Sequence, residues 1–207
     1  MKYENEGPRR GGALCLWASI GQDRMTMATL RAATAADVAA ITAIYRPAVL
    51  RGTASFEVEP PDESEMLHRL MGVVDAGYPY FVAELDGRVV GYAYANAYRT
   101  RPGYRFTVED SVYIAPEAQG KGVGRLLLQA LIETSTAKGY RLMVAVIGDS
   151  RNYASITLHR NLGFTFCGTI HSVGYKFGRW LDSVIMELPL GDGDKTPPTP
   201  LPSGERM

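Results

Sequence analysis

The fold of this chain is decided by one stretch, Val112-Tyr113-Ile114-Ala115-Pro116-Glu117-Ala118-Gln119-Gly120-Lys121-Gly122-Val123-Gly124-Arg125. It reads as a strand, a proline interruption, a glycine-rich turn and the start of a helix. Three glycines let the backbone pass close to a ligand, and the helix N-terminus offers unpaired N–H groups. Together these features suit a pyrophosphate, to which Lys121 and Arg125 can add positive charge.

A glycine turn that leads into a helix is a weak signal on its own, because a tight strand-to-helix connection without a ligand has the same pattern. Rossmann spacing is absent, since the third glycine falls too early and no acidic residue ends a following strand. The Walker pattern is also absent, because no Gly-Lys-Ser/Thr closes the turn. The stretch therefore needs support from the rest of the chain.

Hydrophobic period and turn residues predict the elements around this stretch. Thr34 and Asp37 form a capping box before a helix that Pro47 ends or kinks, and Asp86-Gly87 predicts a hairpin. Gly163 marks the left-handed end of the last helix. Strands are expected over 29–33, 81–85, 89–95, 107–114, 141–147, 166–173 and 183–188, and helices over 38–45, 62–74, 125–137 and 155–162.

Composition narrows the class of protein. The chain has 207 residues, of which 46% are hydrophobic, so one compact domain with a sizeable core is expected. Lys+Arg and Asp+Glu both number 22, which removes the positive field that nucleic-acid binding needs. No apolar run reaches the roughly 20 residues of a membrane-spanning helix. Two cysteines and three histidines predict neither a disulfide scaffold nor a metal site, and a cytoplasmic location fits best.

The two ends of the chain differ from its middle. We expect a disordered leader over 1–28, a domain over 29–190 and a disordered, Pro- and Gly-rich tail over 191–207. Arg9-Arg10 before a short apolar stretch leaves an export signal open. A gene start placed upstream of Met25 or Met27 is the other interpretation of the leader.

The motifs before and after the glycine turn support its interpretation as a ligand-binding turn. Val112-Tyr113-Ile114 precedes Gln119-x-x-Gly122-x-Gly124, and Asn152-x-x-Ser155-x-x-x-His159-x-x-x-Gly163-Phe164 follows it. This combination resembles the GNAT superfamily of acetyl-CoA-dependent N-acetyltransferases over roughly residues 30–190. The resemblance implies an α/β (α+β) fold, with a central mixed, mostly antiparallel sheet flanked by helices.

Within that superfamily the chain is most similar to the phosphinothricin and methionine sulfone (or sulfoximine) N-acetyltransferases. Many short matches in the right order carry this closer resemblance. They are Gly52-Thr53-Ala54-Ser55-Phe56-Glu57, Tyr98, Arg99, Arg101, Tyr104, Glu109, Val112-Tyr113, Val144-Ala145-Val146-Ile147-Gly148 and Lys176-Phe177-Gly178-Arg179-Trp180-Leu181-Asp182.

The resemblance implies acetyl-CoA as co-substrate and no metal. It assigns the pantetheine arm to the backbone of the strand before the turn, and the pyrophosphate to the amides of the turn. It also implies that Asn152 reaches a pantetheine amide, with Ser155 beside it. The implied donor-binding residues are Val112, Tyr113, Ile114, Gln119, Gly120, Lys121, Gly122, Val123, Gly124, Arg125, Asn152 and Ser155.

Two residues are implied as catalytic. The resemblance makes Glu109 the general base, acting through a water. His159 stands where many members have a tyrosine that protonates the departing thiolate, and a histidine can donate a proton near neutral pH. Without the resemblance, Glu109 reads as a half-buried carboxylate paired with Arg99, Arg101 or Arg105, and His159 as a packed side chain.

The acceptor class rests on a pair of arginines. Arg99 and Arg101 can bind carboxylate, phosphinate or sulfone oxygens through bidentate hydrogen bonds, although arginines in such a loop are often simply exposed. Aromatic side chains that can wall a small pocket, or form plain core, are Phe56, Tyr104, Tyr113 and Trp180.

We therefore expect direct acetyl transfer, in a ternary complex, to the α-amine of a small amino-acid-like acceptor. Two alternatives stay open: an acetyltransferase for a polyamine, an aminoglycoside or a protein N-terminus, and a non-catalytic acyl-CoA sensor. The resemblance also implies a homodimer, in which C-terminal strands near Trp180 complete a site across the interface. No nucleic-acid or membrane partner is expected.

Overall fold

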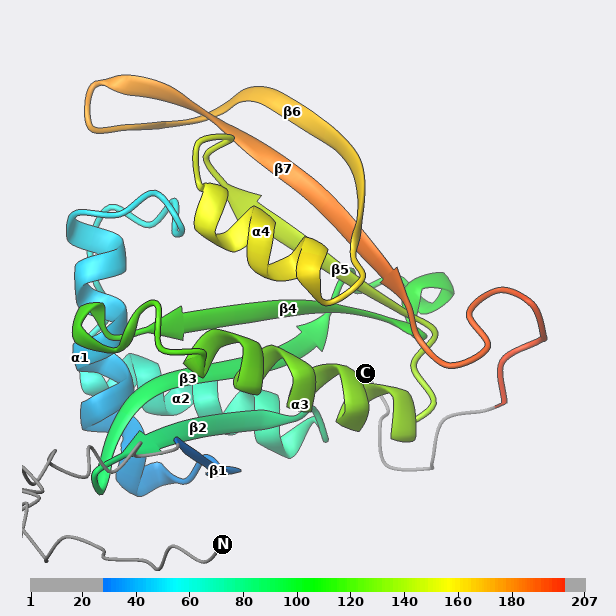
Figure 1. Ribbon diagram of the computed structural model, residues 1–207, viewed down its shortest axis with the longest axis horizontal. Helices are drawn as coiled ribbons and strands as arrows, with labels where there is room; N and C mark the ends of the chain where they lie inside the picture. The colour runs from blue at the N-terminus through cyan, green and yellow to red at the C-terminus, as the bar shows by residue number, and fades with distance from the viewer. Residues whose placement is uncertain (1–27, 200–207) are drawn as a thin grey trace, which may run out of the picture.

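The computed structural model describes residues 28–199, and a seven-stranded sheet forms its centre (Figure 1). The strand order is β1-β2-β3-β4-β5-β7-β6, and every neighbouring pair is antiparallel except β4 and β5. The predicted mixed, mostly antiparallel sheet is confirmed. The strands are β1 (Thr29–Ala32), β2 (Tyr80–Leu85), β3 (Arg88–Ala97), β4 (Thr107–Ile114), β5 (Leu142–Gly148), β6 (Thr165–Lys176) and β7 (Arg179–Pro189). The α-helices are α1 (Val38–Leu50), α2 (Glu63–Asp75), α3 (Val123–Ala137) and α4 (Tyr153–Asn161).

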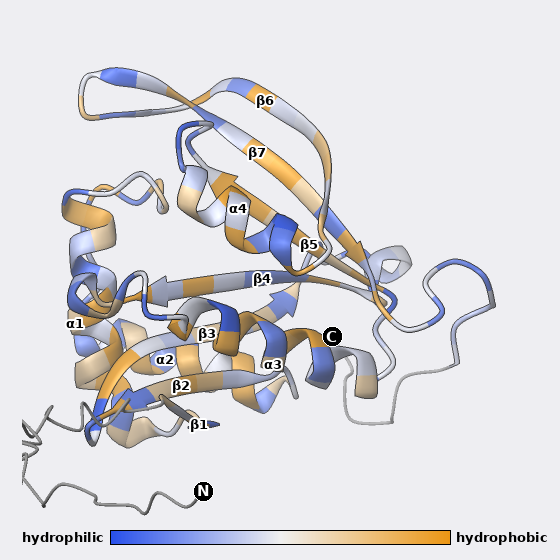
Figure 2. Cartoon of the chain, viewed as in Figure 1, coloured by the Kyte–Doolittle hydropathy of each residue, from blue (hydrophilic) through white to orange (hydrophobic). Residues whose placement is uncertain are grey.

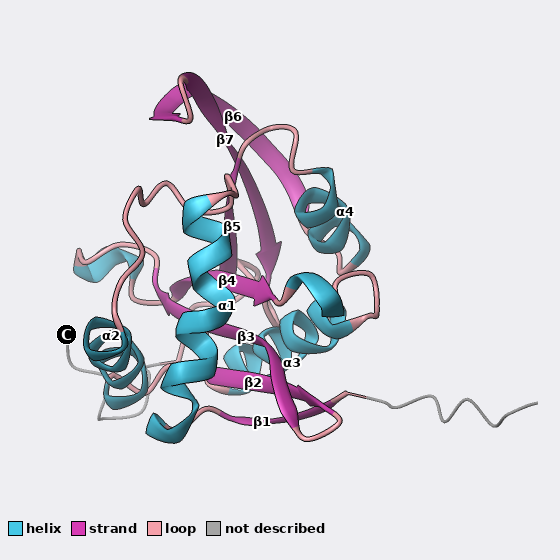
Figure 3. Cartoon of the chain, turned by 90° about the vertical axis from the view of Figure 1, so that its left-hand side faces the viewer, coloured by secondary structure: helices cyan, strands magenta, loops and turns pink. Residues whose placement is uncertain are grey.

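Helices cover both faces of the sheet (Figure 3). α1 and α2 pack on one face and α3 and α4 on the other. Successive residues of a strand face opposite sides, and β4 illustrates this alternation. The ring of Tyr113 contacts Tyr45 of α1 at 4.9 Å between centroids, whereas Asp110 contacts His159 of α4. Glu109 lies four positions before Tyr113 and therefore on the same face of the sheet, the face covered by α1 and α2.

The core is mainly aliphatic and lies between the helices and the inner strands. Leu127, Leu128 and Leu131 of α3 are fully buried and belong to one cluster with Val108 and Ala93 of the sheet. Figure 2 shows the matching hydrophobic stretches along the inner strands. Each fully buried leucine of this kind contributes about 1.5–3 kcal/mol, so the core holds β3 and β4 rigidly beneath α3.

Two tight turns of the same kind shape the hairpins. Asp86 and Gly87 both have positive φ, which confirms the predicted hairpin between β2 and β3. Phe177 and Gly178 repeat this geometry between β6 and β7. These last two strands are longer than expected, since β6 continues past Gly174, which lies beside a register shift, and β7 begins at Arg179.

Pro47 does not end α1, so one of the two outcomes expected there is wrong. The helix continues to Leu50, and the N–H of Arg51 still donates to the carbonyl of Pro47. A proline removes only its own N–H from the helical ladder. Buried Ile44 and Val49 on either side of Pro47 fix both halves of the helix on the sheet.

The start of α1 supplies a pH-dependent prediction. The guanidinium of Arg31 donates to both oxygens of buried Asp37, at 2.7 and 2.6 Å, and the N–H of Thr34 donates to the same carboxylate at 2.8 Å. Hydrogen bonding from Arg31 outweighs burial and lowers the pKa of Asp37 from 3.8 to about 2. Asp37→Asn should therefore lower the free energy of unfolding by about 2 kcal/mol at pH 7.

The loss in free energy of unfolding caused by Asp37→Asn should depend on pH. A carboxyl whose pKa is lower in the folded state than in the unfolded state stabilises the fold when the pH is above its unfolded-state pKa. This stabilisation is lost as the pH falls through its folded-state pKa. Denaturant unfolding of both proteins between pH 7 and pH 3 should show the difference narrowing below about pH 4. A difference that is constant over this range would contradict the ion-pair origin of the effect.

The structure describes only part of the predicted leader and tail. The predicted leader lies outside the described residues except for residue 28. Of the predicted tail, residues 191–199 are described, and Arg141 donates to the carbonyl of Thr196 at 2.9 Å. Within 28–199, no helix has the length and apolar character needed to cross a bilayer, and no cluster of His, Cys, Asp or Glu is placed to hold a metal ion.

Candidate active site

The parallel strands β4 and β5 separate in the middle of the sheet. Their pairing ends at Asp110 opposite Ala145, although β4 continues to Ile114 and β5 to Gly148. On their outer sides β4 stays paired with β3, and β5 with β7, along this whole length. The inner edges therefore present backbone N–H and C=O groups without a partner strand. An extended ligand that contains amide groups can pair with such edges.

The glycine turn follows directly from the end of β4. Gly120 and Gly122 have φ values of 74° and 81°, which only glycine adopts without strain. Gly122 is the N-cap of α3, and the first helical hydrogen bond runs from Leu126 to its carbonyl. The N–H groups of residues 123–125 thus have no helical acceptor and form the positive end of the helix dipole. The turn therefore presents free amides at the start of α3, and phosphate binding there stays a prediction.

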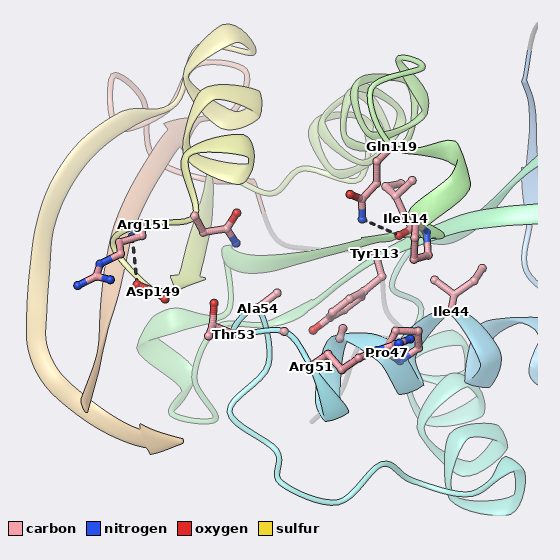
Figure 4. Close-up of a pocket in the computed structure, with 14 residues that line it drawn as sticks. Ile44, Pro47, Arg51, Thr53, Ala54, Tyr113, Ile114, Gln119, Asp149 and Arg151 are labelled. Atoms are coloured by element: carbon pink, nitrogen blue, oxygen red, sulfur yellow. Dashed lines mark hydrogen bonds between the residues drawn. The ribbon is translucent and has the colours of Figure 1, made fainter. Parts of the chain in front are cut away.

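Two cavities meet where the strands separate. The first, of about 590 Å³, lies between the end of α1, the end of β4 and the start of α4 (Figure 4). The second, of about 450 Å³, extends beneath residues 54–57 to Glu109. Ala54, Tyr113 and Asn152 line both cavities, so the two adjoin, and we call them together the cleft.

The loop between α1 and α2 forms one wall of the cleft and is fixed from β6. Lys176 is 5% exposed, and its ammonium donates to the carbonyls of Gly52 and Ser55 at 3.0 and 2.7 Å. Burial lowers the pKa of Lys176. Gly148 and Gly174 allow the loop to approach, because a Cβ at either position would collide with Thr53 or Phe56. The loop conformation is therefore set by residues of β5 and β6, which are distant in sequence.

Glu109 is half-buried at the inner end of the cleft. Burial raises the pKa of its carboxyl, the charge of Asp110 raises it further, and the charge of Arg99 partly opposes both. A carboxylate with a raised pKa is a stronger base than one in water, and it can take a proton from an amine or a water. The position and the electrostatics both suit the predicted general base.

His159 lies on the other side of the cleft, on α4. Its Nδ1 lies 2.8 Å from the carbonyl oxygen of Ser155, and its Nε2 lies 3.0 Å from Asp110. Burial alone would lower the pKa of His159, but the hydrogen bond and charge of Asp110 raise it. Both ring nitrogens are thus already engaged.

A third cavity, of about 440 Å³, lies between α2 and strands β2 and β3. Asn96, which lines it, is the register partner of Glu109. Its walls carry five tyrosines, from α1, from β2 and the connection before it, and from β3. They also carry an ion pair of 2.7 Å between Arg69 and Glu57. Burial raises the pKa of Tyr94 in this wall, and the charge of Glu109 adds to the shift. We call this cavity the tyrosine chamber.

The structure brings together some of the predicted site residues and not others. The cleft is lined by Glu109, His159, Val112, Tyr113, Ile114, Gln119, Asn152, Ser155 and Phe56. The rest of the turn, from Gly120 to Arg125, continues from Gln119 into α3. Arg99, Arg101 and Tyr104 lie in the exposed connection between β3 and β4, and Trp180 lies on the β6–β7 hairpin. None of these last four lines the three cavities described here.

Sequence reasoning missed several residues of the site. Arg51, Asp149 and Arg151 line the outer part of the cleft, where Arg151 and Asp149 are joined through a backbone N–H (Figure 4). Asp110 lines the inner part. Lys176 was among the residues that carry the family resemblance, but only its burial beneath the loop indicates what it does.

Residues 30–185 match the family model described as an acetyltransferase (GNAT) domain. The chain belongs to the GNAT acetyltransferase family. It is 55% identical to a phosphinothricin N-acetyltransferase of Alcaligenes faecalis over 82% of this chain and 86% of the relative. It is 46% identical to an L-methionine sulfoximine/L-methionine sulfone acetyltransferase of Salmonella typhimurium over 79% of this chain and 95% of the relative.

A solved GNAT structure supports the same assignment. The crystal structure of a phosphinothricin acetyltransferase from Sinorhizobium meliloti, in complex with acetyl-CoA, matches with a TM-score of 0.83 and 49% identity. The match covers 87% of this chain and 99% of the other. The predicted family, its fold and its enzyme class are confirmed. The separated strands, the turn amides and the cleft of this GNAT chain supply the features that such a ligand requires.

Asn152 offers a prediction that separates folding from binding. Its side-chain oxygen accepts a hydrogen bond from the N–H of Ser155 at 3.2 Å and caps α4, while the residue also lines both parts of the cleft. Asn152→Ala should lower the free energy of unfolding by about 1 kcal/mol, because the cap is lost. Asn152→Ser keeps a capping oxygen but removes the carboxamide donor.

The two variants of Asn152 should therefore differ. Asn152→Ser should melt within a degree or two of the parent, since serine caps as well as asparagine, yet raise KM for acetyl-CoA several-fold. Thermal melts and initial rates at varied acetyl-CoA check both. An unchanged KM in both variants would mean that Asn152 serves only the helix.

Proposed function

We propose that this protein transfers the acetyl group of acetyl-CoA to the amine of a small amino-acid-like acceptor of the phosphinothricin, methionine sulfone or methionine sulfoximine type. The observation that carries the proposal is the separation of β4 and β5 beyond Asp110, with half-buried Glu109 at its inner end. Two relatives of 55% and 46% identity bear the names of such enzymes, which supports this acceptor class.

We propose that acetyl-CoA lies along the cleft, with its pyrophosphate at the glycine turn and its thioester at the inner end. The amides of residues 119–125 would hold the pyrophosphate, because they lie at the start of α3. The free edge of β4 over Val112, Tyr113 and Ile114 would pair with the pantetheine arm, and Asn152 and Ser155 would approach it from α4. The thioester then lies at the inner end of the cleft, beside Glu109.

Glu109 would act as general base, through a water. At pH 7 an α-amine with a pKa near 8 costs about 1.4 kcal/mol to deprotonate, against about 4.6 for a lysine-type amine. The amine nitrogen bonds to the acetyl carbon, its proton moves to Glu109, and the electron pair of the C–S bond leaves with sulfur. A thiol pKa of about 8.5 makes sulfur a tolerable leaving group, so acid catalysis by His159 is the smaller contribution.

Two features support a small anionic or zwitterionic acceptor. Burial and the charge of Asp110 raise the pKa of Glu109, and the charge of Arg99 opposes them to a smaller extent, so this guanidinium lies within electrostatic range of the base. We propose that Arg99 and Arg101, with Tyr104 and Trp180, close over the acceptor from the β3–β4 connection and the hairpin. The tyrosine chamber beside Glu109 offers hydroxyl groups to sulfone or phosphinate oxygens.

A screen of acceptors tests the proposal. The protein is mixed with acetyl-CoA and each amine, and release of free thiol is followed. Phosphinothricin, methionine sulfone or methionine sulfoximine should give the highest kcat/KM, and their N-acetyl forms should give none. Preference for a polyamine, an aminoglycoside or an N-terminal peptide would overturn the acceptor class, and tight acetyl-CoA binding without any transfer would favour a sensor.

Initial rates test the direct attack. With both substrates varied, double-reciprocal plots should intersect, because no covalent acetyl-enzyme forms. Parallel lines would indicate a ping-pong mechanism and contradict the proposal.

We also propose a homodimer formed through the β6–β7 hairpin, which projects from the body of the molecule (Figure 1). Tyr175 and Trp180 are 61% and 63% exposed there and contact each other, with Ile170 and Val173 also exposed. Exposed apolar groups gathered in this way are typical of interaction surfaces. Trp180→Asp should yield a monomer in light scattering, and a parent that is itself monomeric would rule the dimer out.

Cys167 is a free, exposed thiol, and such thiols persist in reducing compartments, so we propose the cytoplasm. Recovery of the protein outside the cytoplasmic fraction would contradict this.

A further inference from the structure

Asp110 and His159 form a buried pair at the inner end of the cleft. Asp110 is 7% exposed and His159 is 3% exposed, and Oδ2 of the former lies 3.0 Å from Nε2 of the latter. Asp110 is also the last residue of β4 that pairs with β5. The pair therefore lies where the two strands begin to separate.

The contacts of the imidazole determine its protonation. Nδ1 lies 2.8 Å from the carbonyl oxygen of Ser155, which can only accept, so Nδ1 carries a proton. A neutral ring would then turn the lone pair of Nε2 toward the carboxylate of Asp110. Two acceptors facing each other at 3.0 Å repel. A ring protonated on both nitrogens instead donates one hydrogen bond to the Ser155 carbonyl and one to Oδ2 of Asp110. The arrangement favours an imidazolium next to an ionised Asp110.

No other charged group competes for the ring among the described residues that contact it. Ser155 of α4 contributes its carbonyl and its hydroxyl, and Phe164 packs edge-on at 4.9 Å. Asp110 is the charged side chain of β4 that faces the ring, while Glu109 lies on the opposite side of the strand. The charge state of His159 thus depends on Asp110.

The second oxygen of Asp110 connects this pair with the cleft. Oδ1 is buried and has no hydrogen-bond partner within residues 28–199, and Asp110 lines the inner cavity together with Ser155 and His159. A buried carboxylate oxygen without a donor is costly unless a ligand or a water completes it. The carboxylate is therefore in place to act on whatever occupies the inner end of the cleft.

We propose that Asp110 is a positioning residue of the reaction: it holds His159 in the doubly protonated form and so sets the charge beside the thioester. The inference rests on the proposed acetyl transfer for its consequence, but the state of the ring belongs to the protein alone. It also gives His159 a defined role. The ring carries positive charge at the site of bond cleavage and has no nitrogen lone pair with which to act as a base.

Nitrogen-15 NMR of the histidine rings tests this directly on the whole protein. The chain has only three histidines, and exposed His68 and His171 provide internal references. In the parent at pH 7.5, both ring nitrogens of His159 should show the shifts of an imidazolium. A neutral ring with one protonated nitrogen would overturn the proposal, whether or not any acceptor is known.

Asp110→Asn is the matched variant, because its side chain has the same shape and can donate to a neutral ring. His159 should become neutral at pH 7.5, and its titration should move down by at least one pH unit. The pH limb of kcat that belongs to His159 should move with it, while KM for the acceptor changes less than twofold. Asp192→Asn, the same change at an exposed carboxylate paired with Arg141, should move neither.

The outcomes separate the two proposals. A His159 titration that is unchanged in Asp110→Asn overturns the role of Asp110. A shifted titration with an unmoved kcat limb shows that the pair is structural only, which also overturns it. Failure of every amine in the thiol-release screen would instead count against the proposed function, and the ring measurement would still decide the state of His159.

Discussion

Glu109→Gln should lower kcat by about 10² to 10⁴, with little change in KM for acetyl-CoA. The amide has the shape of the carboxylate but cannot accept a proton, so the acceptor amine must lose its proton to water. Glu109 borders the inner end of the cleft and the backbone there does not depend on its charge, since β4 is held by β3 and β5. The loss should therefore appear in turnover.

Stability distinguishes a catalytic Glu109 from a structural one. Burial raises the pKa of this carboxyl, which means that the folded state disfavours its charge. Removing the charge should leave the melting temperature unchanged or raise it, whereas loss of a structural ion pair would lower it. Glu133→Gln, on the exposed surface of α3, provides the control for the same chemical change and should alter neither rate nor stability.

The pH profile provides a second readout of the same residue. Only the ionised form of Glu109 is a base, so kcat/KM of the parent should fall as the pH drops through its raised pKa. A separate limb near pH 8 should belong to an α-amine acceptor. Glu109→Gln should abolish the acidic limb and keep the other. An acidic limb that persists in Glu109→Gln would assign the base to another group.

Much of the fold could be predicted because its signals are local. The turn at Asp86-Gly87, the capping box of Thr34 and Asp37 and the glycine turn after Ile114 each depend on a few neighbouring residues, and the structure has all three. The predicted span of β4, residues 107–114, is the observed one. The end of α1 was missed because a helix packed on a sheet tolerates Pro47, and packing is not a local property.

The site was predicted less completely, because its remaining parts depend on distant contacts. Asp110 and His159 lie 49 positions apart, and nothing in either neighbourhood indicates that they pair. Lys176 fixes carbonyls 121 and 124 positions away. The tyrosine chamber gathers side chains from four elements, and single tyrosines in strands predict only a core. Such features follow from the register of the sheet, which sequence patterns alone do not determine.

Gly148→Ala should lower kcat/KM for acetyl-CoA at least tenfold, because the loop over the cleft has no room for a side chain there. An added Cβ would lie 2.2 Å from the carbonyl oxygen of Thr53 and 3.1 Å from the ring of Phe56. A backbone carbonyl cannot move unless the loop moves, and Lys176 holds that loop at Gly52 and Ser55. The displacement costs about 1–3 kcal/mol and shifts one wall of the cleft.

Three glycines of the same sheet form a graded series for this test. An added Cβ at Gly174 would meet only the ring of Phe56, at 2.5 Å, and that ring can rotate, so Gly174→Ala should have a smaller effect. Gly168→Ala meets nothing within 4 Å and should behave as the parent. Melting temperatures and kcat/KM should follow the order 148, 174, 168. Equal losses at all three positions would point to strand propensity as the cause. The expected order would instead mean that the loop between α1 and α2 must pack closely on β5 and β6 for the cleft to bind acetyl-CoA.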